Sequence, residues 1–96
     1  TAEVDLHIEE LTSDVHILTP HQILHIQKDY FMRCIDSAIA ARYKKIIFIH
    51  GVGNGILKRE IENYLHENEG FEFYDAPLAK YGFGATEVVI HYNILK

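Results

Sequence analysis

The feature that most constrains the fold is a continuous apolar run over Lys45–His50, followed at once by a glycine-rich turn and a helical pattern. Isoleucine and phenylalanine fill the interior of this run, which is typical of a central strand buried on both faces. The turn, residues 51–55, has glycine at its first, third and fifth positions. A buried strand that passes through such a turn into a helix predicts a layered α/β domain.

Two helices are expected to cover this strand. The first is predicted over residues 19–42, because Thr-Pro-His-Gln at its start combines a capping box with a proline in the first turn. Its apolar residues, among them Cys34, recur at three- and four-residue spacing and are expected to face the core. The second helix is predicted over residues 56–68, with Ile56 pointing inward and Gly70 as the stop.

Three further segments show strand patterns. Residues 3–8 alternate between apolar and polar side chains, and residues 71–75 and 86–92 are rich in aromatic and β-branched residues. Residues 9–18 have no clear period and are expected to be a connection, as are residues 76–85. The predicted order is β-α-β-α-β-β, and its right-handed crossovers imply parallel pairing. The fold class is therefore a two-layer α/β sandwich, in which a mixed sheet packs against two helices.

Size and composition predict a single domain over residues 1–96, since 48% of the residues are hydrophobic and 24% are charged. The longest apolar run, Ile46–Ile49, is far too short to span a bilayer, so no membrane association is expected. The chain starts without methionine or a secretory signal, which predicts that it comes from a longer protein with other domains. Cys34 is the only cysteine, which excludes disulfides and favours a reducing, cytoplasmic location.

The charge balance opposes non-specific nucleic-acid binding. Nine basic and fourteen acidic residues give a net charge of −5, the wrong sign for a protein that binds phosphate by bulk attraction. A local basic patch remains compatible with this balance.

Polar side chains lie where two of the predicted strands end. Asp5 and His7 share one face of the first strand, and His50 ends the central strand. Because ligands bind at the carboxyl ends of parallel strands, these groups are expected to converge. Asp5 and His7 could be a general acid–base pair or a hydrogen-bonded pair that orients a loop, and His50 could contact a phosphate or cap the turn. Their spacing does not predict a metal site.

The glycine turn has two interpretations. Glycines and the free N–H groups of the next helix favour an anion, and Lys58 and Arg59 in that helix would then meet a phosphate. The alternative is a plain tight turn capped by Asn54. The pattern GVGNG is neither a dinucleotide fingerprint nor a P-loop.

A second loop, residues 80–84, offers a cation, Lys80, and two aromatic residues, Tyr81 and Phe83. These could form a stacking surface for single-stranded nucleic acid, or the aromatic rings could pack back on the sheet. The remaining histidines are expected at the surface or at interfaces: His16, His21, His25, His66 and His91.

Three motifs, in order along nearly the whole chain, resemble those of the small MutS-related (Smr) domain family. Residues 4–7 (VDLH) are similar to its opening Leu-Asp-Leu-His element, and residues 49–57 (IHGVGNGIL) to its central His-Gly-x-Gly-x-Gly-x-Leu turn. Residues 82–86 (GFGAT) resemble its late Gly-x-Gly-Ala-Thr element. The chain departs from the family pattern at Ile8, where the opening motif usually has glycine, and at Tyr81, where the late motif usually begins with one.

The resemblance implies a nucleic-acid-binding module, on single-stranded or branched DNA or on RNA, with nicking as the activity in several members. It implies catalytic roles for Asp5, His7 and His50. It places the family's loop glycines at Gly51, Gly53 and Gly55. With the turn and loop residues above and the late motif, the predicted nucleic-acid contacts are Gly51, Gly53, Asn54, Gly55, Lys58, Arg59, Lys80, Gly82, Gly84 and Thr86. No cofactor is expected, apart from the open question of a divalent metal. The competing hypothesis is a non-catalytic protein-interaction or assembly module on the same fold, which the acidic residues Glu9 and Glu10 favour.

Overall fold

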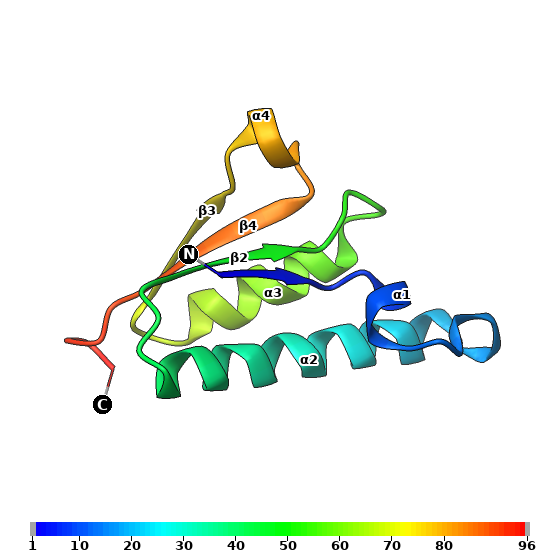
Figure 1. Ribbon diagram of the computed structural model, residues 1–96, viewed down its shortest axis with the longest axis horizontal. Helices are drawn as coiled ribbons and strands as arrows, with labels where there is room; N and C mark the ends of the chain where they lie inside the picture. Colours follow the sequence, from blue (N-terminus) through cyan, green and yellow to red (C-terminus); the bar gives the residue numbers. More distant parts are fainter. Residues whose placement is uncertain (1, 96) are drawn as a thin grey trace.

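Four strands form one mixed sheet in the computed structural model, which describes residues 2–95 (Figure 1). The strands are β1 (Ala2–Asp5), β2 (Lys45–Ile49), β3 (Phe71–Asp75) and β4 (Ala85–Ile90). Their order is β1-β2-β4-β3, with β1 parallel to β2 and β4 antiparallel to both of its neighbours. The predicted parallel crossover from β1 to β2 is confirmed, whereas β2 and β3 are separated by β4.

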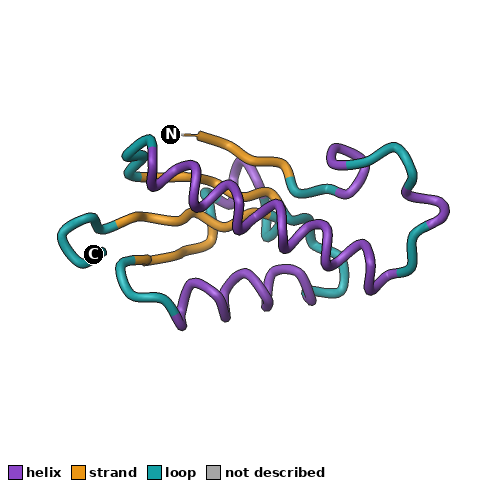
Figure 2. The backbone as a smooth tube through the Cα atoms, turned by 90° about the horizontal axis from the view of Figure 1, so that it is seen from below, coloured by secondary structure: helices purple, strands orange, loops and turns teal. Residues whose placement is uncertain are grey.

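Two long helices cover one face of the sheet, as the tube view shows (Figure 2). They are α2 (Pro20–Ala40) and α3 (Ile56–Glu67). The predicted capping box at the start of α2 is present, since the N–H of Gln22 donates to Thr19 Oγ1 at 3.1 Å and the N–H of Thr19 donates to Gln22 Oε1 at 2.9 Å. Helix α2 ends two residues earlier than predicted, because Arg42 adopts the left-handed conformation with φ of 61°.

Helix α3 packs Leu57, Ile61 and Leu65 against the sheet, with a spacing of four residues. The prediction that Ile56 points inward is wrong, since its side chain is 45% exposed. As the first residue of α3, Ile56 lies beside the glycine turn and outside the packed stripe.

Strand β2 is buried on both faces, as its sequence predicts. On the helix side, Phe48 packs edge-to-face against Phe31 of α2, with ring centroids 4.7 Å apart. On the opposite side, Ile47 belongs to a smaller cluster with Ala76, Ala85 and the partly buried Tyr81. Tyr81 ends the single-turn helix α4 (Leu78–Tyr81), which stands over this face (Figure 1).

Several predicted boundaries are wrong, most of them where a short helix occurs. Strand β1 ends at Asp5, and Ile8 begins the short helix α1 (Ile8–Leu11). The segments expected to be plain connections contain α1, the 3₁₀ turn η1 (Val15–Ile17) and α4, and β4 stops at Ile90. Elements of one turn are too short for hydrophobic periodicity to reveal them. The predicted fold class, a mixed sheet packed against two long helices, is confirmed.

Among the described residues, no helix combines the length and apolar character needed to cross a membrane. Cys34 is partly buried and packs against the edge of the core, as its place in the apolar pattern predicts.

Candidate functional site at the carboxyl ends of β1 and β2

Backbone hydrogen bonds bring the three motif segments together. The N–H of Leu6 donates to Ile49 O at 2.8 Å, which joins the end of β1 to the end of β2. The N–H groups of His50 and Gly51 both donate to Gly84 O at 2.9 Å, which ties the glycine turn to the residue before β4. The predicted convergence of the polar strand ends is therefore present.

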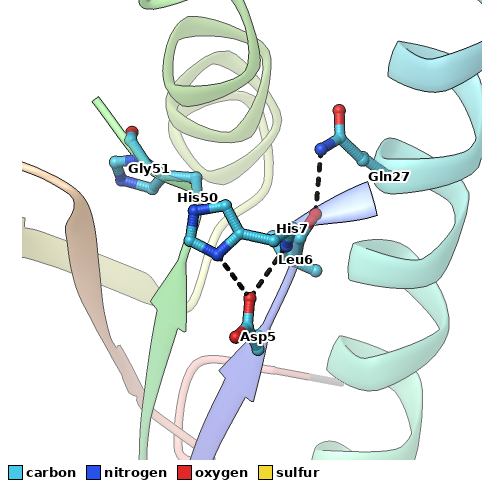
Figure 3. Close-up of polar contacts among 6 residues, drawn as sticks. All are labelled: Asp5, Leu6, His7, Gln27, His50 and Gly51. Carbon is cyan, nitrogen blue, oxygen red and sulfur yellow. Dashed lines mark hydrogen bonds and ion pairs between the residues drawn. The ribbon is translucent and has the colours of Figure 1, made fainter. Parts of the chain in front are cut away.

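The side chain of His7 is held by Asp5 (Figure 3). Asp5 Oδ1 accepts from His7 Nδ1 at 2.8 Å and from the His7 backbone N–H at 2.9 Å. An ionised carboxylate can only accept, so Nδ1 carries the hydrogen and Nε2 is the ring nitrogen with a free lone pair. Both side chains remain nearly half exposed, so a ligand can reach them.

Gly51 lies directly against this histidine ring. A Cβ atom at Gly51 would lie 2.9 Å from His7 Nε2, and the φ of Gly51 is +78°. Both the contact and the backbone conformation require glycine at this position. The ring edge that carries Nε2 thus faces the start of the glycine turn.

His50 occupies a different environment from His7. Its side chain is buried, its Nδ1 lies 2.8 Å from Gly51 O, and its Nε2 lies 2.9 Å from Thr86 Oγ1. Since a carbonyl only accepts, Nδ1 donates, and the neutral ring accepts from the Thr86 hydroxyl at Nε2. Burial lowers the pKa of His50, which favours this neutral form.

This arrangement makes His50 and Thr86 internal parts of the turn. Thr86 is completely buried, and its hydroxyl bonds to the buried His50 ring. A direct contact of either residue with nucleic acid stays a prediction.

The glycine turn shows features of both interpretations. Asn54 Oδ1 accepts from the N–H of Ile56 at 3.0 Å, which is the cap that the plain-turn reading requires. Gly53 and Gly55 adopt positive φ angles of 43° and 80°. The N–H groups of residues 52–54 have no hydrogen-bond partner within residues 2–95, so they remain available to an anion.

The predicted cations are placed unequally. Arg59 is exposed near the start of α3, whereas Lys58 Nζ is bound to Asp75 Oδ1 at 2.9 Å. Lys80 of α4 lies 3.3 Å from Glu3 Oε2, on the sheet face opposite the long helices. Arg59 therefore lies one helical turn beyond Gly55, to whose carbonyl its N–H donates at 3.0 Å, whereas Lys80 is directed toward β1.

In the loop over residues 80–84, each of the two aromatic residues fits a different interpretation. Tyr81 packs back on the sheet and its hydroxyl bonds to Glu3, as the structural reading predicts. Phe83 is 61% exposed, as a stacking surface requires. Gly82 has open space around it, while Gly84 is buried against Gly51. Of the other histidines, His91 pairs with Glu72, and His16, His21, His25 and His66 are exposed.

Sequence reasoning missed Gln27. Its Nε2 donates to Leu6 O at 2.9 Å, so α2 restrains the chain between Asp5 and His7 (Figure 3). A single amide on a helix gives no signal of such a contact. A groove of about 370 Å³ runs from there to the glycine turn. It is lined by Pro20, His21, Ile23, Leu24, Gln27, Asn54, Ile56 and Leu57.

A metal site is not formed by these residues. Within residues 2–95, no three or more histidine, cysteine or acidic side chains are arranged to hold a metal ion. His50 is directed toward Thr86, away from the Asp5–His7 pair.

Comparison with known families identifies the fold. The family model of the Smr domain matches residues 13–91. The chain belongs to the Smr domain family. The matched residues of this Smr domain include His50, the glycine turn and Thr86, and they begin after Asp5 and His7.

Relatives with curated names are much longer than this Smr domain. The protein named Endonuclease MutS2 from Aquifex aeolicus is 39% identical over 60 residues, which are 62% of this chain and 8% of that protein. The protein of the same name from Ligilactobacillus salivarius is 44% identical over 59 residues, which are 58% of this chain and 7% of that protein. The chain thus spans less than a tenth of these relatives.

A solved structure shares the fold. The crystal structure of the Smr domain of Thermus thermophilus MutS2 aligns with a TM-score of 0.66 and 24% identity, and the alignment covers 95% of this chain and 99% of that one. This similarity shows a common fold over almost the full length.

Proposed function

We propose that this Smr domain binds nucleic acid at the carboxyl ends of β1 and β2 and nicks a phosphodiester bond there. The observation that carries the proposal is the His7 ring, held by Asp5 with its Nε2 facing Gly51. Membership of the Smr family and the name Endonuclease MutS2 of its relatives support the same activity.

The phosphate would bind to the glycine turn. The N–H groups of residues 52–54 and of the first turn of α3 carry partial positive charge, which can bind a phosphate without a positive net charge on the protein. Arg59 adds a charge beside them. This arrangement lets a protein of net charge −5 bind a single phosphate locally.

His7 would then move the proton. A hydroxyl group, from water or from the 2′ position of RNA, attacks the phosphorus while His7 Nε2 takes its proton. The bond to the leaving ester oxygen breaks, and the proton passes to that oxygen. Asp5 keeps the hydrogen on Nδ1 and stabilises the charged ring that forms between the two steps. His50 would act as a positioning residue that fixes the turn.

The test is the rate at which His7→Gln nicks plasmid DNA and a labelled RNA, compared with His66→Gln. His66 is an exposed histidine in the last turn of α3, so it controls for the chemical change alone. We expect the His7 variant to lose about 100-fold or more of the rate, the lower range for proton transfer, and the His66 variant to keep it. Equal rates for the wild type and His7→Gln would contradict the proposal.

The scheme needs no resident cofactor, and assays with magnesium, with manganese and with EDTA measure any need for a divalent cation. We propose that the domain works within a longer protein, since its relatives are more than ten times the matched length. A cytoplasmic location agrees with a nucleic-acid substrate.

A second candidate function is a non-catalytic assembly module. The observation in its favour is the exposed pair Glu9 and Glu10 in α1, which directly follows His7 and opposes a polyanion. Binding of labelled single strands, duplexes and branched DNA at low salt separates the two functions. No binding by the wild type to any of these, or to RNA, would favour the assembly module.

A further inference from the structure

A basic hollow lies at the end of the sheet opposite the candidate site. It has a volume of about 540 Å³ and is lined by Ala2, Ala41, Arg42, Tyr43, Lys44 and Lys45. Three of its six lining residues are cationic and none is acidic, although acidic residues outnumber basic ones in the chain. The hollow is lined by the turn between α2 and β2. This turn precedes β2, whereas the glycine turn follows it, so the two turns lie at opposite ends of the strand (Figure 1).

Arg42 adopts a conformation that side chains usually avoid. Its φ of 61° makes it the only residue other than glycine with positive φ within residues 2–95. The N–H of Tyr43 donates to Ala38 O at 2.9 Å and that of Arg42 to Ile39 O at 3.1 Å, the helix-ending pattern in which this position is usually glycine. Arginine here is less favourable for the backbone than glycine, so its side chain is the feature to explain.

The guanidinium of Arg42 is held in place by an aromatic ring. It lies 4.1 Å from the ring centroid of Tyr92, and the Tyr92 hydroxyl donates to Ala38 O at 3.2 Å and to Tyr43 O. Stacking uses the face of the guanidinium and leaves N–H groups at its edge available for an oxyanion.

The charges in the hollow are mostly unpaired. Within residues 2–95, neither Arg42 nor Lys44 makes an ion pair, and Lys45 lies 3.7 Å from Glu87. The negative end of the α2 dipole favours a cation nearby, but Lys44 and Lys45 would satisfy it without a strained arginine. Arginine adds what a lysine cannot, a planar guanidinium that stacks on Tyr92 and keeps N–H groups for an anion at its edge.

We infer that the basic hollow binds the phosphate backbone of the same nucleic acid that reaches the glycine turn. This inference rests on the proposed function. Strand β2 lies between the basic hollow and the glycine turn. About six residues at a rise of 3.3 Å each place the two surfaces roughly 20 Å apart. That distance corresponds to about six phosphate steps along one strand of a duplex. The hollow would thus hold the backbone while the glycine turn holds the phosphate that reacts.

The test is the salt dependence of binding to a fluorescent 20-base-pair duplex and to the corresponding single strand, a length of about three times the expected span. The variants are Arg42→Gly, Lys44→Gln and the double variant. Arg42→Gly suits the purpose because glycine adopts the backbone conformation without strain, so we expect the Tm to change little. Arg33→Gln is the control, since Arg33 is an exposed arginine on α2 that pairs with Asp29.

We expect each hollow variant to weaken binding and to reduce the slope of log Kd against log salt by about one, and the double variant by about two. Arg33→Gln should leave the slope unchanged. An equal change with Arg33→Gln would show an effect of net charge alone and would overturn the inference.

The inference can be wrong while the proposed function holds. One outcome is that the wild type binds, that Arg59→Ala weakens binding, and that the double variant keeps the wild-type slope. The hollow then does not contact the backbone, and only this inference is overturned. If the wild type binds none of these nucleic acids, both proposals are overturned. Binding to phosphatidylserine vesicles through the same residues, without nucleic-acid binding, would give the hollow a different partner and also overturn it. Lys44→Gln alone decides the question if Arg42→Gly fails to fold.

Discussion

His7 and His50 lie on either side of Gly51 and differ in almost every physical respect. His7 is half exposed, bound to a carboxylate, and has a free Nε2. His50 is buried, and both of its ring nitrogens bond to neutral groups of the protein. A carboxylate partner supports a charged imidazole, whereas burial opposes one. These different surroundings are the basis of our proposal that His7 transfers a proton and that His50 holds the turn in place.

Asp5→Asn should have the largest effect of the variants that distinguish His7 from His50. Asparagine keeps the shape of the side chain but removes the charge that stabilises a protonated His7. We expect the nicking rate to fall about 100-fold, within the range for proton transfer, while the Tm stays near that of the wild type. Rate and Tm measured on one preparation check this, and an unchanged rate would make Asp5 a structural residue.

Gly51→Ala should damage both environments at once. The new Cβ would lie 2.9 Å from His7 Nε2, and alanine would have to adopt a φ of +78°. We expect a loss of about 1–3 kcal/mol in the free energy of unfolding, with a displaced His7 ring. Urea unfolding measures the first effect. The NMR shifts of the His7 ring measure the second, and Gly53→Ala, which has open space around its Cβ, is the matched control.

Thr86→Val should affect His50 alone. Valine has the shape of threonine but cannot donate to Nε2, so a buried ring nitrogen loses its partner. We expect a loss of about 1–2 kcal/mol, within the usual range for an unsatisfied buried group. The nicking rate should fall only as far as the folded fraction falls. A large rate loss in a fully folded variant would give the His50–Thr86 pair a direct part in the reaction.

The smallest expected effect is a pH dependence of stability. Burial lowers the pKa of His50 below its usual value near 6.5, so the unfolded chain takes up a proton more readily than the folded one. Its contribution is complete above about pH 6.5 and is lost as the pH falls below that value. Urea midpoints at about pH 7.5 and about pH 5.5 should therefore differ in the wild type and differ less in His50→Gln.

This pH window lies above the range in which Glu3 and Glu72 take up a proton. Hydrogen bonds from Tyr81 and Tyr74 lower the pKa of Glu3 and Glu72, respectively, so their contributions are lost only in more acidic solution. The same pH dependence in the wild type and in His50→Gln would show that another group is responsible.

The sequence predicts the features that depend on local patterns. The strand before the glycine turn, the capping box at Thr19 and the meeting of Asp5, His7 and His50 at one end of the sheet follow from composition and periodicity. Each of these depends on neighbouring residues or on the known geometry of parallel strands.

The features it does not predict depend on distant contacts. The burial of His50 requires Thr86, which lies 36 residues further along the chain. The end of α2 is fixed by Arg42 in a conformation that usually indicates glycine. The contact from Gln27 to Leu6 crosses from a helix to a loop. None of these leaves a periodic signal in the chain.

The two halves of the candidate site lie on strands of different local stability. Strand β1 has four residues and pairs only with β2, whereas β2 is paired on both sides. Edge strands open locally at a lower free energy than central strands, so β1 can detach while β2 and β4 hold the glycine turn. Each such opening would separate Asp5 and His7 from Gly51 without unfolding the domain. The hydrogen bond from Gln27 to Leu6 O opposes this opening, so the side-chain amide of a helix residue helps to keep Asp5 and His7 beside the glycine turn.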